Sequence, residues 1–206
     1  MAKTYYDSPF GIARYPWVNK PDVKFNDDGL YKIGLILEGA DAEKLRERVD
    51  REVEAAFNEK TADLTPGERK KWKTYVPYEV EEDDQGNPTG RVIFDFKQNA
   101  KIRLKSGEVK EVKIGLYDST DKEMHKPVFG GSEVRVRYSF RAIAVAGTKQ
   151  AGVRLDFSMV QVRKLSSGTG GRGFGSTVED GYVEEDEGEA PSGFGTQAPA
   201  TASSDY

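Results

Sequence analysis

From Tyr75 onward, polar and apolar residues alternate with a period of two, and turn-forming residues interrupt the alternation at short intervals. A period of two places every second side chain on the same face, which is the pattern of a β-strand with one buried face. The longest alternating run extends from Glu133 to Val145, turns at residues 147–149 and returns from Val153 to Val162. This part of the chain can bury its apolar residues most simply as a series of strands.

Shorter alternating runs lie between Tyr75 and the long run. They cover residues 75–80, 91–97, 101–105 and 109–117. Aspartate, glycine and proline at residues 83–90 separate the first two runs, and Ser106 with Gly107 separate the last two. Short runs joined by such turn residues predict hairpins.

The segment before Tyr75 contains one strand and one helix. Residues 30–37 alternate, with Lys32 on the polar face and Tyr31, Ile33, Leu35 and Leu37 on the apolar face. In residues 41–60 the apolar residues recur every three or four positions, which predicts a helix that begins at the N-cap Asp41. Its apolar positions are Ala42, Leu45, Val49, Val53 and Phe57. Six or more strands with one helix favour a small barrel or a sandwich, and a barrel hides its strand edges better.

The last forty residues differ from the rest in composition and in charge. Residues 1–165 hold 30 Lys and Arg against 27 Asp and Glu, whereas residues 166–206 hold one Arg against eight acids. The C-terminal segment begins as a glycine-rich linker and has few aliphatic residues, so we expect it to be a disordered acidic tail. We therefore predict two parts, a globular domain at 1–165 and a flexible tail at 166–206. The tail is either a polyanion mimic carried by a nucleic-acid binder or a solubilising extension.

Several classes of function lack the residues they need. The chain has no cysteine, and its single histidine, His125, lies in a polar stretch typical of a solvated loop. Neither a histidine or cysteine metal site nor a cysteine nucleophile can form, and no carboxylate pair stands in an apolar context. We expect no catalytic residue, no metal and no cofactor. The sequence shows no signal peptide and no transmembrane segment, which predicts a cytoplasmic protein.

Positive charge gathers on the polar faces of the predicted strands. Arg135, Arg137 and Arg141 share one face of the longest run, and we call them the arginine stripe. The opposite, inward face of this run carries Val134, Val136, Tyr138 and Phe140. On the next runs, alternation places Lys101, Arg103, Lys105, Lys113 and Tyr117 outward, and Ala100, Ile102, Leu104, Val112, Ile114 and Leu116 inward. A basic surface of this kind suits a polyanion, although lysine and arginine are also common at ordinary solvent-facing positions.

Aromatic residues are dense near the N-terminus. Tyr5, Tyr6, Phe10, Tyr15 and Trp17 fall within the first 17 residues. Flat side chains beside cations stack on nucleic-acid bases without regard to sequence, but aromatic residues also fill protein cores. For Tyr15, Trp17 and Tyr117 the sequence leaves both roles open.

Four blocks of sequence are similar to a known family, the single-stranded DNA-binding proteins of short-tailed bacteriophages. The blocks are Gly11–Asp22, Gly29–Leu35, Asp118–Ser119 with Lys122–Met124, and Pro127–Ser139. The resemblance implies a mainly β, OB-fold barrel of five to seven strands with one inserted helix, and binding of single-stranded DNA without strong sequence preference. The candidate DNA-contacting residues are then Tyr15, Trp17, Lys32, Lys101, Arg103, Lys105, Lys113, Tyr117, Arg135, Arg137 and Arg141.

The resemblance also gives the acidic tail a role. In that family the tail contacts replication proteins and occupies the DNA site when DNA is absent, and the proteins can promote annealing. The corresponding candidates are Glu184, Glu185, Asp186, Glu187, Glu189, Asp205 and Tyr206. The implied partners are phage or host DNA polymerase, helicase/primase and recombination proteins in the cytoplasm of an infected host cell. A homodimer is compatible with this reading.

The tail of this chain departs from the family pattern, and other functions remain open. Seventeen nearly neutral residues follow Glu189, and one acid precedes the terminal Tyr206. The glycine-rich piece around Phe174 is compatible with an RNA-binding or annealing protein. A structural β-barrel protein with a solubilising tail is a third alternative.

Overall fold

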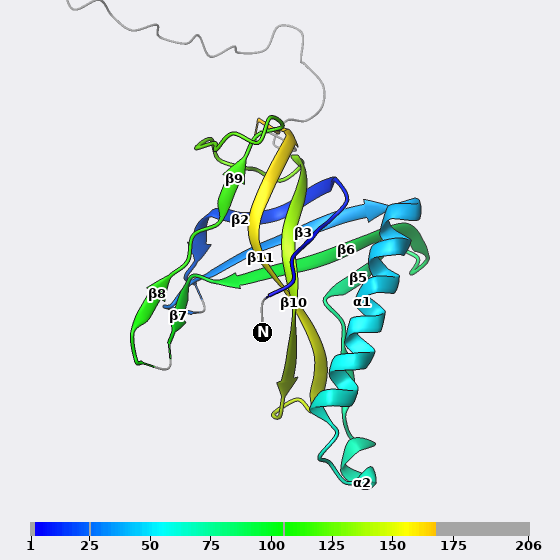
Figure 1. Cartoon of the computed structure of the whole chain (residues 1–206). Coiled ribbons are helices and arrows are strands. Elements are labelled where there is room, and N and C mark those ends of the chain that lie inside the picture. The colour runs from blue at the N-terminus through cyan, green and yellow to red at the C-terminus, as the bar shows by residue number, and fades with distance from the viewer. Residues whose placement is uncertain (1–2, 25, 105, 168–206) are drawn as a thin grey trace, which may run out of the picture. The chain divides into compact units, whose positions relative to one another are not determined.

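Five long strands close into a barrel (Figure 1). They are β2 (Gly11–Asp22), β3 (Leu30–Glu38), β6 (Pro88–Asn99), β10 (Glu133–Val145) and β11 (Gln150–Lys164). Antiparallel pairs join β2 to β3, β3 to β6, β10 to β11 and β10 to β2, and a short parallel pair between β6 and β11 completes the circuit. This closure is that of an OB fold, which confirms the predicted fold class. The computed structural model describes residues 3–24, 26–104 and 106–167.

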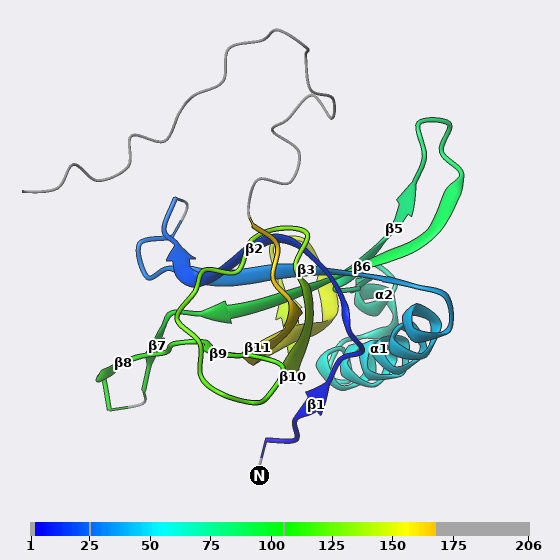
Figure 2. The ribbon, with the colours of Figure 1, turned by 90° about the horizontal axis from the view of Figure 1, so that it is seen from above.

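Within these residues, six short strands add to the barrel. β1 (Tyr6–Asp7) pairs with β10, β5 (Tyr78–Glu82) pairs with β6, and β4 (Lys73–Tyr75) and β9 (Gly115–Tyr117) pair in parallel with β11. β7 (Lys101–Arg103) and β8 (Val109–Glu111) form a separate two-stranded hairpin. Seen from above, this hairpin and the β5–β6 arm project from opposite sides of the barrel (Figure 2).

The long helix α1 (Gly39–Lys60) is the predicted inserted helix, and it packs against β10 and β11 (Figure 1). Its N-cap is Glu38, so the prediction that Asp41 caps the helix was wrong. Gly39 has a φ of +59°, which lets the chain turn directly from β3 into the helix three residues earlier than expected. Ala56 is buried where Phe57 was expected, and Phe57 lies under Arg69 at the edge of the buried face.

A second, short helix, α2 (Pro66–Arg69), follows α1. Thr65 and Glu68 close its first turn with a capping box. Neither helix of the described chain is long and apolar enough to cross a membrane.

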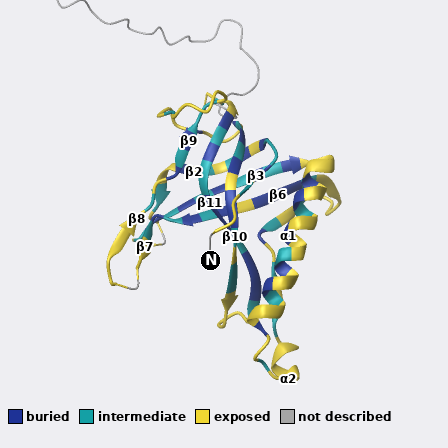
Figure 3. Ribbon diagram, in the orientation of Figure 1, coloured by how far each residue is buried: buried dark blue, intermediate teal, exposed yellow. Residues whose placement is uncertain are grey.

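The core lies inside the barrel and beneath α1 (Figure 3). The alternation predicted most of its faces correctly, including the following inward residues: Tyr31, Ile33, Leu35, Leu37, Ile114, Leu116, Val134, Val136 and Tyr138. Ile102 and Leu104 were expected inside but are 39% and 41% exposed. They belong to the projecting β7–β8 hairpin, where neither face meets the core. The expected strand at 109–117 is also divided, because β8 ends at Glu111 and β9 begins at Gly115.

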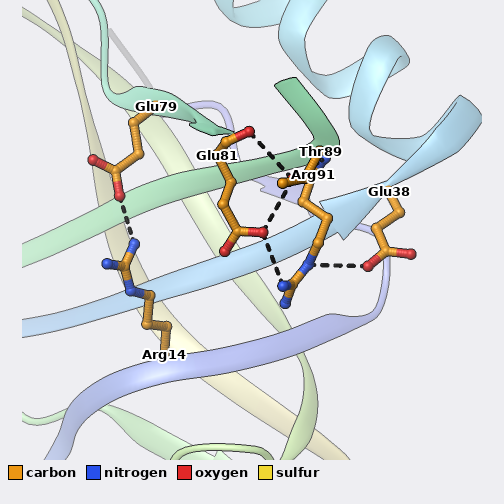
Figure 4. A network of polar contacts seen from close by, with 6 residues as sticks. All are labelled: Arg14, Glu38, Glu79, Glu81, Thr89 and Arg91. Carbon is orange, nitrogen blue, oxygen red and sulfur yellow. Dashed lines mark hydrogen bonds and ion pairs between the residues drawn. The ribbon is translucent and has the colours of Figure 1, made fainter. Parts of the chain in front are cut away.

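Ion pairs hold the β5–β6 arm against the barrel (Figure 4). Arg91 binds Glu81 at 2.9 Å and Glu38 at 3.1 Å, and Thr89 donates a hydrogen bond to the Glu81 carboxylate at 3.1 Å. Arg14 of β2 reaches Glu79 of β5 across the intervening strands. This last contact spans the outer face of the barrel, and Arg14 and Glu79 form one wall of a hollow on that face.

Candidate nucleic-acid interface

Three neighbouring hollows on the outer surface of the barrel contain most of the predicted DNA-contacting residues. The first hollow has a volume of about 480 Å³ and lies across β2, β3 and β6. Trp17, Lys32 and Lys97 occupy facing positions on these three strands and form one row. Arg14, Gly34 and Asp95 form a parallel row beside it. The strand register therefore brings together side chains that are far apart in sequence.

Two of the three aromatic residues that line the first hollow are accessible, and the third, Phe96, is buried. Tyr15 is 75% exposed and Trp17 is 45% exposed. The Arg14 guanidinium lies 5.5 Å from the centre of the Tyr15 ring, and the Lys32 ammonium lies 5.7 Å from the centre of the Trp17 ring. Tyr15 has a φ of +46°, a left-handed conformation that is strained for an aromatic residue and is concentrated at functional sites. The core role that the sequence left open for these two residues is thus excluded by their exposure.

Acids hold two of the cations in the first hollow. The Asp22 carboxylate accepts a 2.7 Å hydrogen bond from Lys32, and this bond lowers the pKa of Asp22. Glu79 accepts a hydrogen bond from Arg14, which raises the pKa of that guanidinium further. A carboxylate therefore holds each of these two cations in place before any ligand binds.

The second hollow, of about 580 Å³, adjoins the first. Lys97 and Asp156 face each other across β6 and β11, and Asp156 lines the second hollow. This carboxylate is 6% exposed because Arg154, Arg141 and Lys3 surround it, with nitrogen–oxygen distances of 2.5, 3.8 and 4.0 Å. Lys101 and Arg103 from the β7–β8 hairpin complete its basic wall. Asp156 thus gathers three cations. The lining of the second hollow is net positive, because it contains four cations (Lys3, Lys101, Arg103 and Arg141) and two acids (Asp28 and Asp156).

The third hollow consists of two adjoining cavities, of about 430 Å³ and 40 Å³, that share Asp7, Arg137 and Met159. Tyr5 lines the larger cavity, and its ring centre is 5.7 Å from the ammonium of Lys3 in the second hollow. The smaller cavity is lined by Tyr117, Asp121, Arg135, Gln161 and the three shared residues.

Two arginines of the third hollow are tied to neighbours. Arg137 donates to both oxygens of Asp7, at 2.7 and 2.9 Å, and these bonds lower the pKa of Asp7. Arg135 donates to Gln161 at 2.7 Å and lies 5.2 Å from the centre of the Phe10 ring.

The structure places the predicted residues in groups instead of one stripe. Tyr15, Trp17 and Lys32 meet in the first hollow; Lys101, Arg103 and Arg141 meet in the second; Tyr117, Arg135 and Arg137 meet in the third. Lys113 is exposed and lines none of the three hollows. Lys105 and the tail candidates Glu184, Glu185, Asp186, Glu187, Glu189, Asp205 and Tyr206 lie outside the described residues.

Three cations and one exposed aromatic residue that line the hollows were not among the predicted contacts, namely Lys3, Arg14, Lys97 and Tyr5. Lys97 could have been found, because alternation in residues 91–97 places it opposite the buried Phe96. No sequence pattern indicates Lys3, because it precedes β1 and belongs to no alternating run. Only the folded chain brings it close to Asp156 of β11. Among the described residues there is no group of three or more His, Asp or Glu side chains that could hold a metal ion.

An OB barrel with cations and exposed aromatic residues on its outer face has the features of an oligonucleotide-binding domain. Residues 10–165 match the sequence model of the family described as "Single-stranded DNA-binding protein, Bacteriophage T7", and the chain belongs to this family.

Solved structures and curated sequences were also compared with the chain. The structure is similar to gp2.5, a single-stranded DNA-binding protein encoded by bacteriophage T7, with a TM-score of 0.68 and 23% identity over 89% of this chain and 100% of that one. It is also similar to the single-stranded DNA-binding protein of bacteriophage Enc34, with a TM-score of 0.53 and 13% identity over 82% of this chain and 86% of that one. A structure of the Enc34 protein in complex with single-stranded DNA matches with a TM-score of 0.53 and 12% identity over 79% and 87% of the two chains. No curated protein sequence matches this chain.

Proposed function

We propose that this chain binds single-stranded DNA along the three hollows, without strong sequence preference, and protects the bound strand. The observation that carries the proposal is the placement of exposed Trp17 and Tyr15 beside fixed cations in the first hollow, next to the basic second hollow. Cations attract the phosphates of any sequence, and every base offers a face for stacking. The match of the family model over residues 10–165 supports the same function.

The proposal is tested by comparing the affinity of the full chain for single-stranded DNA, duplex DNA and RNA over a series of salt concentrations. For about four to six phosphates neutralised, log K against log salt should fall with a slope of roughly −3 to −4. Duplex DNA should bind more weakly, since stacking needs unpaired bases. If RNA binds more tightly than single-stranded DNA, the result favours the alternative of an RNA-binding protein. If the chain binds none of the three nucleic acids, the result favours a structural protein.

The finer parts of the proposal concern partners and cellular role. We infer that the acidic tail recruits polymerase, helicase/primase or recombination proteins, and that binding and annealing proceed without catalysis in the cytoplasm of the infected host. The excess of eight acids over one Arg in residues 166–206 supports such recruitment. Analytical ultracentrifugation, with and without DNA, tests whether the chain forms a homodimer. Pull-down of the replication proteins by full-length and tail-deleted chains tests the recruitment.

A further inference from the structure

The first hollow contains a carboxylate that is unexpected at a site for DNA. Asp95 of β6 lies beside Gly34, in the row that also contains Arg14. Its backbone amide donates to the carbonyl of Pro77 at 2.9 Å, which fixes the residue between β5 and β3. Gly34 has no side chain, and a Cβ at this position would meet Arg14 and Ile93 at 3.3 Å, so these neighbours pack closely over the glycine beside the carboxylate.

Asp95 is the acid of this hollow that has no direct partner. Four charged groups face it, namely Lys97, Glu79, Arg14 and Lys32. Arg14 is bound to Glu79 and Lys32 is bound to Asp22, so two of the three cations are already paired. Within the described residues, the Asp95 carboxylate makes no hydrogen bond and no ion pair within 4 Å. The residue as a whole is exposed, and desolvation of its carboxyl group raises the pKa of Asp95.

The ligand chemistry that suits Asp95 follows from its charge. A phosphate cannot lie against a carboxylate, so DNA in this hollow must present a hydrogen-bond donor there, and the donors of DNA are on the edges of the bases. Guanine offers two parallel donors to a carboxylate, N1–H and the 2-amino group, whereas thymine offers the single N3–H. Cytosine and adenine each offer one amino group. Bidentate, charge-assisted hydrogen bonds are the strongest of these arrangements.

The geometry points to a guanine-preferring subsite in the first hollow, in which Asp95 accepts the Watson–Crick edge of a base that stacks on Trp17 or Tyr15. The volume of about 480 Å³ is in the range of sites that hold small organic ligands. This inference rests on the proposed function and deepens it. The remainder of the interface stays indifferent to sequence, and one position along the strand discriminates between bases.

The test uses the full chain and thymidine oligonucleotides of about eight nucleotides, within the usual site size of an OB fold. One central base is guanine, hypoxanthine, cytosine or thymine. Guanine should tighten binding roughly fivefold or more over thymine, the lower end of what one bidentate contact to a base contributes. Hypoxanthine lacks the 2-amino group and should lose most of this gain. Equal binding of guanine and thymine would overturn the subsite but leave DNA binding intact, while failure of every oligonucleotide to bind would overturn both proposals.

The variant Asp95→Asn should change two measured quantities in opposite directions, namely the affinity for the all-thymine oligonucleotide and the preference for guanine. It should bind the all-thymine oligonucleotide more tightly than the natural chain does, because one negative charge is removed from the path of the phosphates. It should also lose the preference for guanine. Asp63→Asn makes the same charge change on an exposed turn outside the three hollows and should keep the preference. A guanine preference that survives in Asp95→Asn would overturn the role of this carboxylate.

Discussion

Replacing Trp17 by alanine should separate DNA binding from stability. One base stacked on an aromatic side chain contributes ~1–3 kcal/mol, so the dissociation constant for single-stranded DNA should rise roughly 5- to 150-fold. A fully buried Trp costs about 3–5 kcal/mol when truncated to Ala, and Trp17 is 45% exposed, so the stability loss should be about half of that. Domains of this size usually have about 5–15 kcal/mol of stability, and the variant should therefore remain folded.

The chain has two tryptophans, which makes the assay direct. Trp72 precedes β4 and lines none of the three hollows. Quenching of tryptophan fluorescence by an oligonucleotide should disappear in Trp17→Phe and persist in Trp72→Phe, while thermal melting shows both variants to be folded. An unchanged dissociation constant in a folded Trp17→Ala variant would refute the stacking role. Quenching that disappears only in Trp72→Phe would move the binding surface to the basic segment at residues 69–73.

Four further predictions concern the basic surface, the core, Asp95 and the acidic tail. Lys101→Ala combined with Arg141→Ala should make the slope of log K against log salt shallower by roughly 0.7 for each lost phosphate contact, with a small change in melting temperature. Val136→Ala, at a fully buried position, should cost about 2 kcal/mol in a denaturant titration and leave the affinity of the folded protein nearly unchanged. Because the pKa of Asp95 is raised in the folded protein, its charged form opposes folding; Asp95→Asn should melt higher than the natural chain at neutral pH, and the difference should vanish as the pH falls below the ordinary aspartate pKa of about 4. Deleting residues 171–206 should tighten DNA binding at low salt, where a tethered polyanion competes most strongly, and identical affinities in a salt series would exclude such competition.

The sequence alone predicts which side chains of the barrel strands point inward and which point outward. Period-two alternation depends only on which residues of a single strand are buried. Val134, Val136 and Tyr138 are inside, and the arginine stripe is outside, as predicted. The partners of those arginines could not be predicted. Asp7 binds Arg137 across 130 positions of sequence, and only the pairing of β1 with β10 brings the two together.

The β7–β8 hairpin shows the limit of the same reasoning. Residues 101–105 alternate as a barrel strand does, but alternation carries no information about whether a hairpin packs on the core or projects from it. The residues of the first hollow could not be grouped from the sequence for a related reason. Its two rows of side chains depend on which residues of β2, β3 and β6 face one another in the sheet. A single sequence shows which residues share a face but not which strands are neighbours.

Photo-crosslinking tests most directly whether single-stranded DNA lies in the three hollows. An oligonucleotide with bromodeoxyuridine at each position in turn would be crosslinked to the full chain, and the modified residues identified by mass spectrometry. We expect crosslinks at Tyr15, Trp17 and Tyr5, which are exposed aromatic residues of the first and third hollows. Crosslinks confined to Trp72, or to the turn between β5 and β6 at residues 83–87, would contradict this placement of the DNA.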